Sequence, residues 1–183
     1  SHLTRFMLAL RFDERMDRAV RDLWDATAAE GIAVVGVNGH RPHISIASYD
    51  VDDLQYACDT LELIVQRIEQ FPMRLHSLGV FPERSVAFLS PHFTESLFSL
   101  HRKLLQGFAD AGFPPVAYKH LEIDKWTPHC TVVTDASPNE VTRALDVLVR
   151  TWEPISGWVE AIGLLVPPAI HDMFESRFIV PNS

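Results

Sequence analysis

The same short phrase occurs twice in the chain, once in each half. Residues 41–46 read Arg-Pro-His-Ile-Ser-Ile, and residues 127–132 read Thr-Pro-His-Cys-Thr-Val. Each copy therefore has a proline, a histidine, an apolar residue, a hydroxyl residue and a second apolar residue. Alternation of polar and apolar residues over such a stretch predicts a half-buried β-strand, and proline is tolerated at the first residue of a strand. Two such strands in one chain point to a fold with two similar halves.

The spacing within each copy places two polar side chains on one face of its strand. Side chains two positions apart point the same way in a strand, so His43 shares a face with Ser45, and His129 shares a face with Thr131. The residue between them points to the opposite face, into apolar packing. If the two halves meet about a pseudo-two-fold axis, two imidazoles and two hydroxyls converge on one groove.

Such a set of four side chains suits phosphoryl chemistry. The reference pKa of histidine is about 6.5, so a neutral and a charged imidazole coexist near that pH. The neutral imidazole removes a proton from water, and the charged one protonates the departing oxygen. The hydroxyls donate hydrogen bonds to the non-bridging oxygens, where negative charge builds up in the transition state. This chemistry requires no metal ion and no cofactor, and we expect neither.

The rest of the sequence predicts an α+β fold built on antiparallel sheet. Apolar residues at helical spacing, preceded by capping residues, predict helices over 13–29, 52–68, 94–108 and 137–152. Short apolar runs between turn residues predict strands over 5–12, 32–37, 42–49, 74–81, 85–89, 128–134, 155–166 and 173–180. No Gly/Ser-rich or low-complexity linker interrupts the chain, so we expect residues 1–183 to form a single domain.

The paired motifs resemble those of the two-histidine (2H) phosphoesterase superfamily, in particular its bacterial 2′-5′ RNA ligase-like and cyclic phosphodiesterase branches. The likeness continues from the opening strand and helix to Leu-Gly-Val-Phe at 78–81, Val-Ala-Phe-Leu at 86–89 and Trp-Thr-Pro-His-Cys-Thr at 126–131. It implies a bilobal, pseudo-two-fold duplicated fold, in which antiparallel sheets line a central cleft and the helices lie outside. The two lobes would comprise roughly residues 1–80 and 81–183.

The resemblance also implies an enzyme. It implies a cyclic phosphodiesterase or 2′-5′ RNA ligase-like phosphoesterase that opens a 2′,3′-cyclic phosphate of a nucleotide or RNA end to a 2′-phosphate, with reversible 2′-5′ RNA ligation as a related reaction. Carried over by position, His43 and His129 are the catalytic pair, and Ser45 and Thr131 bind the phosphate. The resemblance favours His129 as base and His43 as acid, and the reverse order stays open. The alternative is a module that binds phosphorylated RNA ends or nucleotides without turnover.

Four further residues near the motifs are candidates for substrate binding. Arg41 and Lys125 flank the motifs and would give the groove a local positive potential. Phe81 and Trp126 are aromatic candidates for stacking a base. The other histidines show no His-x-x-x-His spacing, so we expect no metal site.

Composition limits the partners and the location. The chain carries a formal net charge of −8, whereas proteins that wrap long duplex nucleic acid present a basic face. We therefore expect a nucleotide or RNA end as the substrate, and no long duplex. The apolar runs are too short to span a membrane, and the two cysteines form no Cys-x-x-Cys pair. We expect a cytoplasmic protein with reduced thiols, take a monomer as the working assumption, and interpret Ser1-His2 as a cloning remnant.

Overall fold

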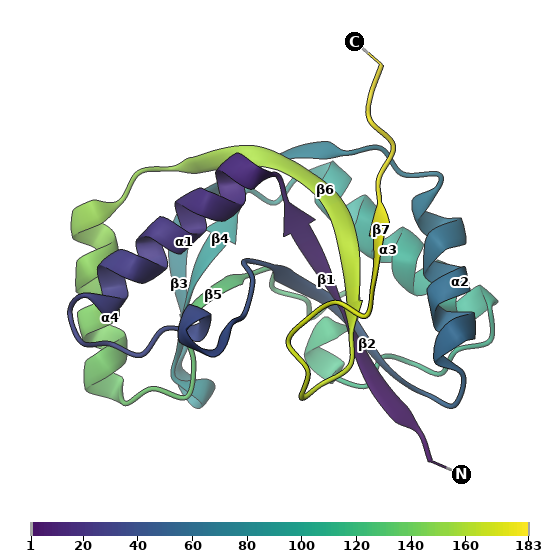
Figure 1. Ribbon diagram of the computed structural model, residues 1–183, viewed down its shortest axis with the longest axis horizontal. Helices are drawn as coiled ribbons and strands as arrows, with labels where there is room; N and C mark the ends of the chain where they lie inside the picture. Colours follow the sequence, from purple (N-terminus) through teal and green to yellow (C-terminus); the bar gives the residue numbers. More distant parts are fainter. Residues whose placement is uncertain (1, 183) are drawn as a thin grey trace.

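The computed structural model describes residues 2–182 and confirms an α+β fold (Figure 1). The strands within this range are β1 (Thr4–Phe12), β2 (Ile44–Val51), β3 (Phe71–Phe81), β4 (Val86–Pro91), β5 (Cys130–Val133), β6 (Ile155–Leu165) and β7 (Phe174–Arg177). The helices are α1 (Glu14–Ala28), α2 (Leu54–Val65), α3 (Glu95–Asp110) and α4 (Pro138–Thr151), with short 3₁₀ helices η1 (Val35–Asn38), η2 (Pro82–Arg84) and η3 (Lys119–Leu121). None of the helices in the described range is long and apolar enough to cross a membrane.

Side-chain caps explain where the helices begin. Asp13, Asp53, Thr94 and Ser137 each accept a hydrogen bond from the backbone N–H three residues further on. These are the preferred N-cap residues, because their short oxygen-bearing side chains satisfy an N–H group that lacks a partner in the helix. At α4 the cap is reciprocal, since the Glu140 side chain also accepts the Ser137 backbone N–H.

The strand predicted over residues 32–37 is wrong. Residues 32–34 have no regular structure, and η1 follows them. Ile32 and Val34 are nevertheless buried, so their alternating pattern reflects packing rather than strand pairing. Gly36 lies directly under the Trp24 ring, where an added Cβ would come within 2.5 Å of the ring. The segment therefore serves as a packing surface for α1.

The strand order shows the pseudo-two-fold arrangement directly. The sheet runs β2-β1-β6-β3-β4-β5, with β7 pairing the far part of β6, and all of these ladders are antiparallel. From one edge the order is β2, β1 and β6, and from the other edge it is β5, β4 and β3. In both halves a motif strand lies at the edge, its partner comes next, and a long central strand follows. The two central strands pair with each other through their first residues, Phe71–Leu75 and Ile155–Val159. The axis of the duplication therefore passes between β3 and β6.

The two halves of the sheet are interleaved along the chain. Helix α1 follows β1 but packs on α4, and α3 follows β4 but packs on α2 (Figure 1). Strand β6, near the end of the chain, pairs with β1 at its beginning. Each motif strand pairs with the strand that precedes it in the chain, β2 with β1 and β5 with β4. The helix between the two paired strands, α1 or α3, covers the other half of the sheet. A division of the chain at about residue 80 therefore does not separate the two halves of the sheet.

Strong curvature brings the two edges of the sheet together. Strands β2 and β5 stand at opposite ends of the strand order, yet they contact each other. The Trp126 indole N–H, just before β5, donates to the Ser45 carbonyl of β2 at 3.0 Å. The helices lie outside, α1 and α4 on one half and α2 and α3 on the other (Figure 1). The fold thus places the two sequence motifs against one another.

Candidate active site

Both motif histidines are held in the same way. His43 directly precedes β2 and His129 directly precedes β5. In each case ring atom Nδ1 lies 2.8 Å from the carbonyl oxygen two residues earlier, that of Arg41 or Thr127. Because a carbonyl oxygen only accepts, Nδ1 carries the proton in the neutral ring and Nε2 carries the lone pair. Neither Nε2 has a protein hydrogen-bond partner within residues 2–182.

A β-bulge follows the hydroxyl residue of each motif. The register of β2 against β1 shifts by one residue between Ser45 and Ala47. The register of β5 against β4 shifts in the same way between Thr131 and Val133. Bulges bend a strand and re-aim its side chains, and they are common beside active sites. The two halves therefore share a β-bulge at the same position as well as the sequence motif.

Both motif hydroxyls are half-buried and weakly engaged. Ser45 Oγ donates to the Met7 sulfur at 3.3 Å, and a thioether is a weak acceptor. The Thr131 hydroxyl has no side-chain partner in the described part of the chain. Neither hydroxyl is therefore held by a strong hydrogen bond to another side chain in the described range.

Two tryptophans donate hydrogen bonds to the backbone carbonyls of the motif hydroxyl residues. Trp126 Nε1 donates to the Ser45 carbonyl, and Trp24 Nε1 donates to the Thr131 carbonyl at 3.2 Å. Trp126 is only 6% exposed and stacks on the buried His101, with ring centroids 4.1 Å apart. The structure therefore corrects its assignment as a substrate-stacking residue. Its ring is buried in the core, and it braces the motif strand instead.

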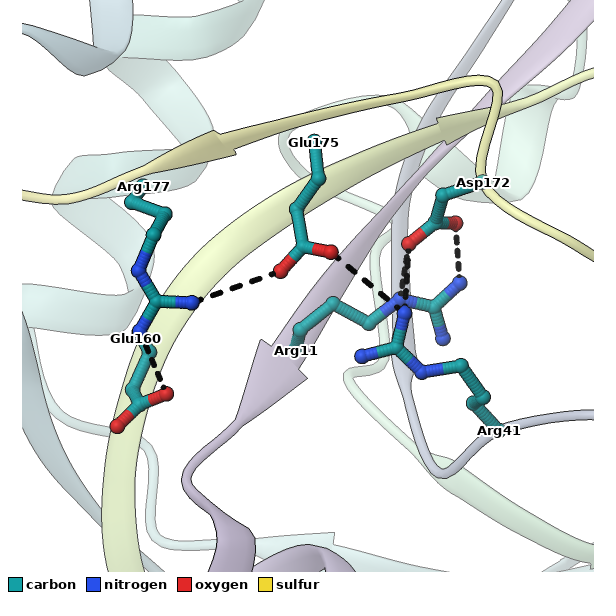
Figure 2. A network of polar contacts seen from close by, with 6 residues as sticks. All are labelled: Arg11, Arg41, Glu160, Asp172, Glu175 and Arg177. Carbon is teal, nitrogen blue, oxygen red and sulfur yellow. Dashed lines mark hydrogen bonds and ion pairs between the residues drawn. The ribbon is translucent and has the colours of Figure 1, made fainter.

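A cluster of ion pairs lies on the His43 side of the site (Figure 2). Arg11 is 2% exposed and holds Asp172 through two nitrogens, at 3.0 and 2.5 Å. Arg41 also reaches Asp172, at 3.1 Å, and Glu175, at 3.6 Å. Figure 2 shows the two guanidinium groups converging on the Asp172 carboxylate. The backbone carbonyl of the candidate Arg41 thus positions the His43 ring. The Arg41 guanidinium is already paired with Asp172 and Glu175.

Aromatic and cationic residues surround His129. The Phe81 ring meets the imidazole edge-on, with centroids 4.9 Å apart, and Phe88 lies 5.4 Å away. A cavity of about 260 Å³ opens here, lined by Phe81, Glu83, Arg84, His120, Lys125, Thr127 and His129. Two of the candidate substrate residues, Phe81 and Lys125, therefore lie in one cavity with a motif histidine.

Burial keeps both imidazoles neutral. Desolvation lowers the pKa of His43 to about 4, with smaller contributions from the positive charge of Arg11 and from His129, while the Arg41 carbonyl acts in the opposite direction. Desolvation also lowers the pKa of His129, and Arg84 adds to this effect. Since the His43 pKa responds to charge on His129, the two rings lie within electrostatic reach of each other. Both are neutral at pH 7 in the unliganded protein.

Sequence reasoning missed several residues of this site. Arg11 carried a usable signal, because it interrupts the apolar run from Phe6 to Phe12 within β1. Asp172, Arg84 and His120 carried none, since they come from a loop and short 3₁₀ segments that show no recognisable motif. No group of three or more potential metal ligands gathers in the part of the chain that the structure describes.

Fold and site together define a class of protein. A duplicated antiparallel sheet with a His-x-Ser/Thr motif at each of two edge strands that contact each other fits the two-histidine phosphoesterases that the paired motifs resemble. Residues 12–168 match the profile of the 2′-5′ RNA ligase superfamily, and the chain belongs to this family. No curated protein sequence matches the chain significantly.

Solved structures share the fold at low sequence identity. Escherichia coli LigT in its apo form has a TM-score of 0.65 and 18% identity, with 98% of this chain and 99% of that chain covered. TT0787 of Thermus thermophilus has a TM-score of 0.64 and 15% identity, with coverage of 97% and 100%. Kluyveromyces marxianus Usb1, solved with uridine monophosphate, has a TM-score of 0.50 and 12% identity, with coverage of 90% and 95%.

Proposed function

We propose that the protein is a phosphoesterase that hydrolyses a 2′,3′-cyclic phosphate of a nucleotide or RNA end to a 2′-phosphate, without a metal ion. The observation that most supports this is the matched pair of imidazoles. His43 and His129 each donate Nδ1–H to a carbonyl two residues earlier, and each leaves Nε2 without a protein partner in the described range. Such rings are held as proton carriers, and a simple binding site has no need of this arrangement.

The proposed reaction moves one proton at each imidazole. Nε2 of the neutral ring takes a proton from water as its oxygen attacks phosphorus. The bond from phosphorus to O3′ breaks, and the other ring, in its charged form, gives its proton to O3′. Ser45 and Thr131 donate hydrogen bonds to the two non-bridging oxygens. When a ribose hydroxyl replaces water as the nucleophile, the same residues would catalyse 2′-5′ RNA ligation.

The substrate itself would supply the conditions for the charged ring. Both imidazoles have lowered pKa values in the unliganded site. A bound phosphate brings negative charge next to them and raises the pKa of the ring that faces it. Protonation and substrate binding would therefore reinforce each other.

The nature of the substrate is supported by the solved relatives. One E. coli LigT structure is a complex with 3′-AMP, with a TM-score of 0.65 and 17% identity to this chain. The Usb1 structure holds uridine monophosphate. A nucleotide or RNA end would also suit a protein of net charge −8, because a few local cationic side chains can hold a small anion, whereas a long duplex would be repelled.

The test is hydrolysis of the four nucleoside 2′,3′-cyclic monophosphates in the presence of EDTA. Wild-type protein is expected to form nucleoside 2′-phosphates, and His43→Ala and His129→Ala are expected to form none at a measurable rate. His76→Ala is a matched control, because His76 is exposed and stacks on the exposed His92. Loss of activity in EDTA that returns with a metal would refute the metal-free reaction. Tight nucleotide binding without turnover of these substrates or of an RNA oligomer with a cyclic end would favour the binding module.

A further inference from the structure

The two sides of the active site differ in how their positive charges are paired. Beside His43, Arg11 and Arg41 are held by Asp172. Beside His129, Arg84 has no acidic partner among the described residues. An arginine in a cavity without a counter-charge is a ready binding group for an anion, because its planar fork matches phosphate oxygens.

Three cationic or titratable side chains reach this cavity from separate segments. Arg84 comes from η2, His120 from η3, and Lys125 from the loop before the second motif. The charge of Arg84 is felt by both His120 and His129, so these groups lie within electrostatic reach of one another. Glu83 is the acidic residue in the lining, and Lys125 also pairs with Glu122 at 2.9 Å. Arg84 is therefore the cation of this lining that no ion pair within the described residues holds.

Geometry favours a phosphate group over a base in this cavity. The Arg84 guanidinium lies 5.5 Å from the centre of the Phe81 ring, within the range of a cation–π contact. This contact holds the guanidinium in place and covers the face that a base would otherwise stack on. The cavity volume of about 260 Å³ is also below the roughly 300–1,000 Å³ typical of sites for whole small molecules.

We propose that this cavity binds a second phosphate group of the substrate. The preferred substrate would then carry a phosphate on the same ribose that bears the cyclic phosphate. That phosphate is either a 5′-phosphomonoester of a mononucleotide or the 5′-phosphodiester of an RNA end. This inference rests on the proposed function, because it places the cyclic phosphate at His43 and His129.

The test compares three substrates that share one base. They are adenosine 2′,3′-cyclic phosphate, its 5′-phosphorylated form, and an adenylyl dinucleotide ending in a 2′,3′-cyclic phosphate. Wild-type kcat/KM is expected to be about tenfold higher with at least one of the two extra-phosphate substrates than with the plain nucleotide, which is about 1.4 kcal/mol. The substrate that shows the larger gain distinguishes the monoester from the diester.

Arg84→Gln is expected to bring this ratio close to one, whereas Arg67→Gln, the same change at an exposed position, is expected to preserve it. The ratio is the readout because Arg84 also influences His129 directly. Equal wild-type kcat/KM on all three substrates would overturn the second-phosphate site and leave the proposed function standing. An unchanged ratio in Arg84→Gln would also overturn it.

Failure of all three substrates to react would count against the proposed function instead. In that case the second-phosphate site is tested by measuring nucleotide affinity. Calorimetry on His43→Ala protein is expected to give about tenfold tighter binding of the 5′-phosphorylated nucleotide than of the plain one. Loss of that difference on adding Arg84→Gln would support the site, and its absence at the outset would refute it.

Discussion

The pH dependence of kcat/KM follows from the state of the two imidazoles in the unliganded protein. The proposed reaction needs one neutral and one charged ring, so the active form carries a single proton on the pair. The pKa of His43 is lowered to about 4, and that of His129 is lowered below its ordinary value of 6.5. Above pH 6.5 the singly protonated fraction therefore falls as pH rises, approaching tenfold per pH unit, and kcat/KM should fall by at least about 50-fold between pH 6.5 and 8.5.

The assay is hydrolysis of a nucleoside 2′,3′-cyclic phosphate from pH 4.5 to 9, with kcat and kcat/KM resolved at each pH. The alkaline fall of kcat should begin at a higher pH than that of kcat/KM, because bound phosphate raises the pKa of the charged ring. Arg84→Gln should move the alkaline limb of kcat/KM to higher pH, since it removes a positive charge that lowers the His129 pKa. A kcat/KM that stays flat from pH 6.5 to 8.5 would show that catalysis does not need a charged imidazole.

Three further predictions concern the residues that support the site. Trp126→Phe should destabilise the fold by about 1–3 kcal/mol in urea unfolding, because the Ser45 carbonyl loses its donor; an unchanged midpoint would contradict the brace. Asp172→Asn should cost about 3–5 kcal/mol in the same assay, since it leaves the buried Arg11 charge uncompensated; a loss below about 1 kcal/mol would argue against that pair. Burial lowers the pKa of His101 to about 4 in the folded protein. Between pH 6.5 and 4, this imidazole therefore becomes protonated in the unfolded chain but stays neutral in the folded one. Stability should therefore drop by about 3 kcal/mol between pH 6.5 and 4 on this account, and His101→Phe should remove that part of the slope.

The features that sequence reasoning predicted are those with local causes. The helix starts at Asp13, Asp53, Thr94 and Ser137 follow from caps that act within three residues. The antiparallel α+β character follows from short-range periodicity. The pairing of the two motifs was also predictable, since it depends on one phrase repeated in both halves.

The features that it missed depend on partners far apart in the chain. Arg11 and Asp172 are 161 positions apart, and no local pattern connects them. Trp126 is an aromatic residue next to a motif, as a base-stacking residue would be. Only the structure shows that β2 lies beside it and that its indole N–H donates to the Ser45 carbonyl. Residues 32–37 have a strand-like alternation, but Ile32 and Val34 are buried by packing and the chain then forms η1, which contacts α1 and β5 without joining the sheet.

In the proposed reaction the two imidazoles act together. The most direct measurement is kcat for hydrolysis of adenosine 2′,3′-cyclic phosphate by His43→Ala, His129→Ala and the double variant, with circular dichroism to confirm folding. Each single variant should lose at least about 100-fold. The double variant should lose little more than the slower single variant, because residues that act as a unit are not additive. Losses that multiply in the double variant, or a single variant with the wild-type rate, would contradict the account.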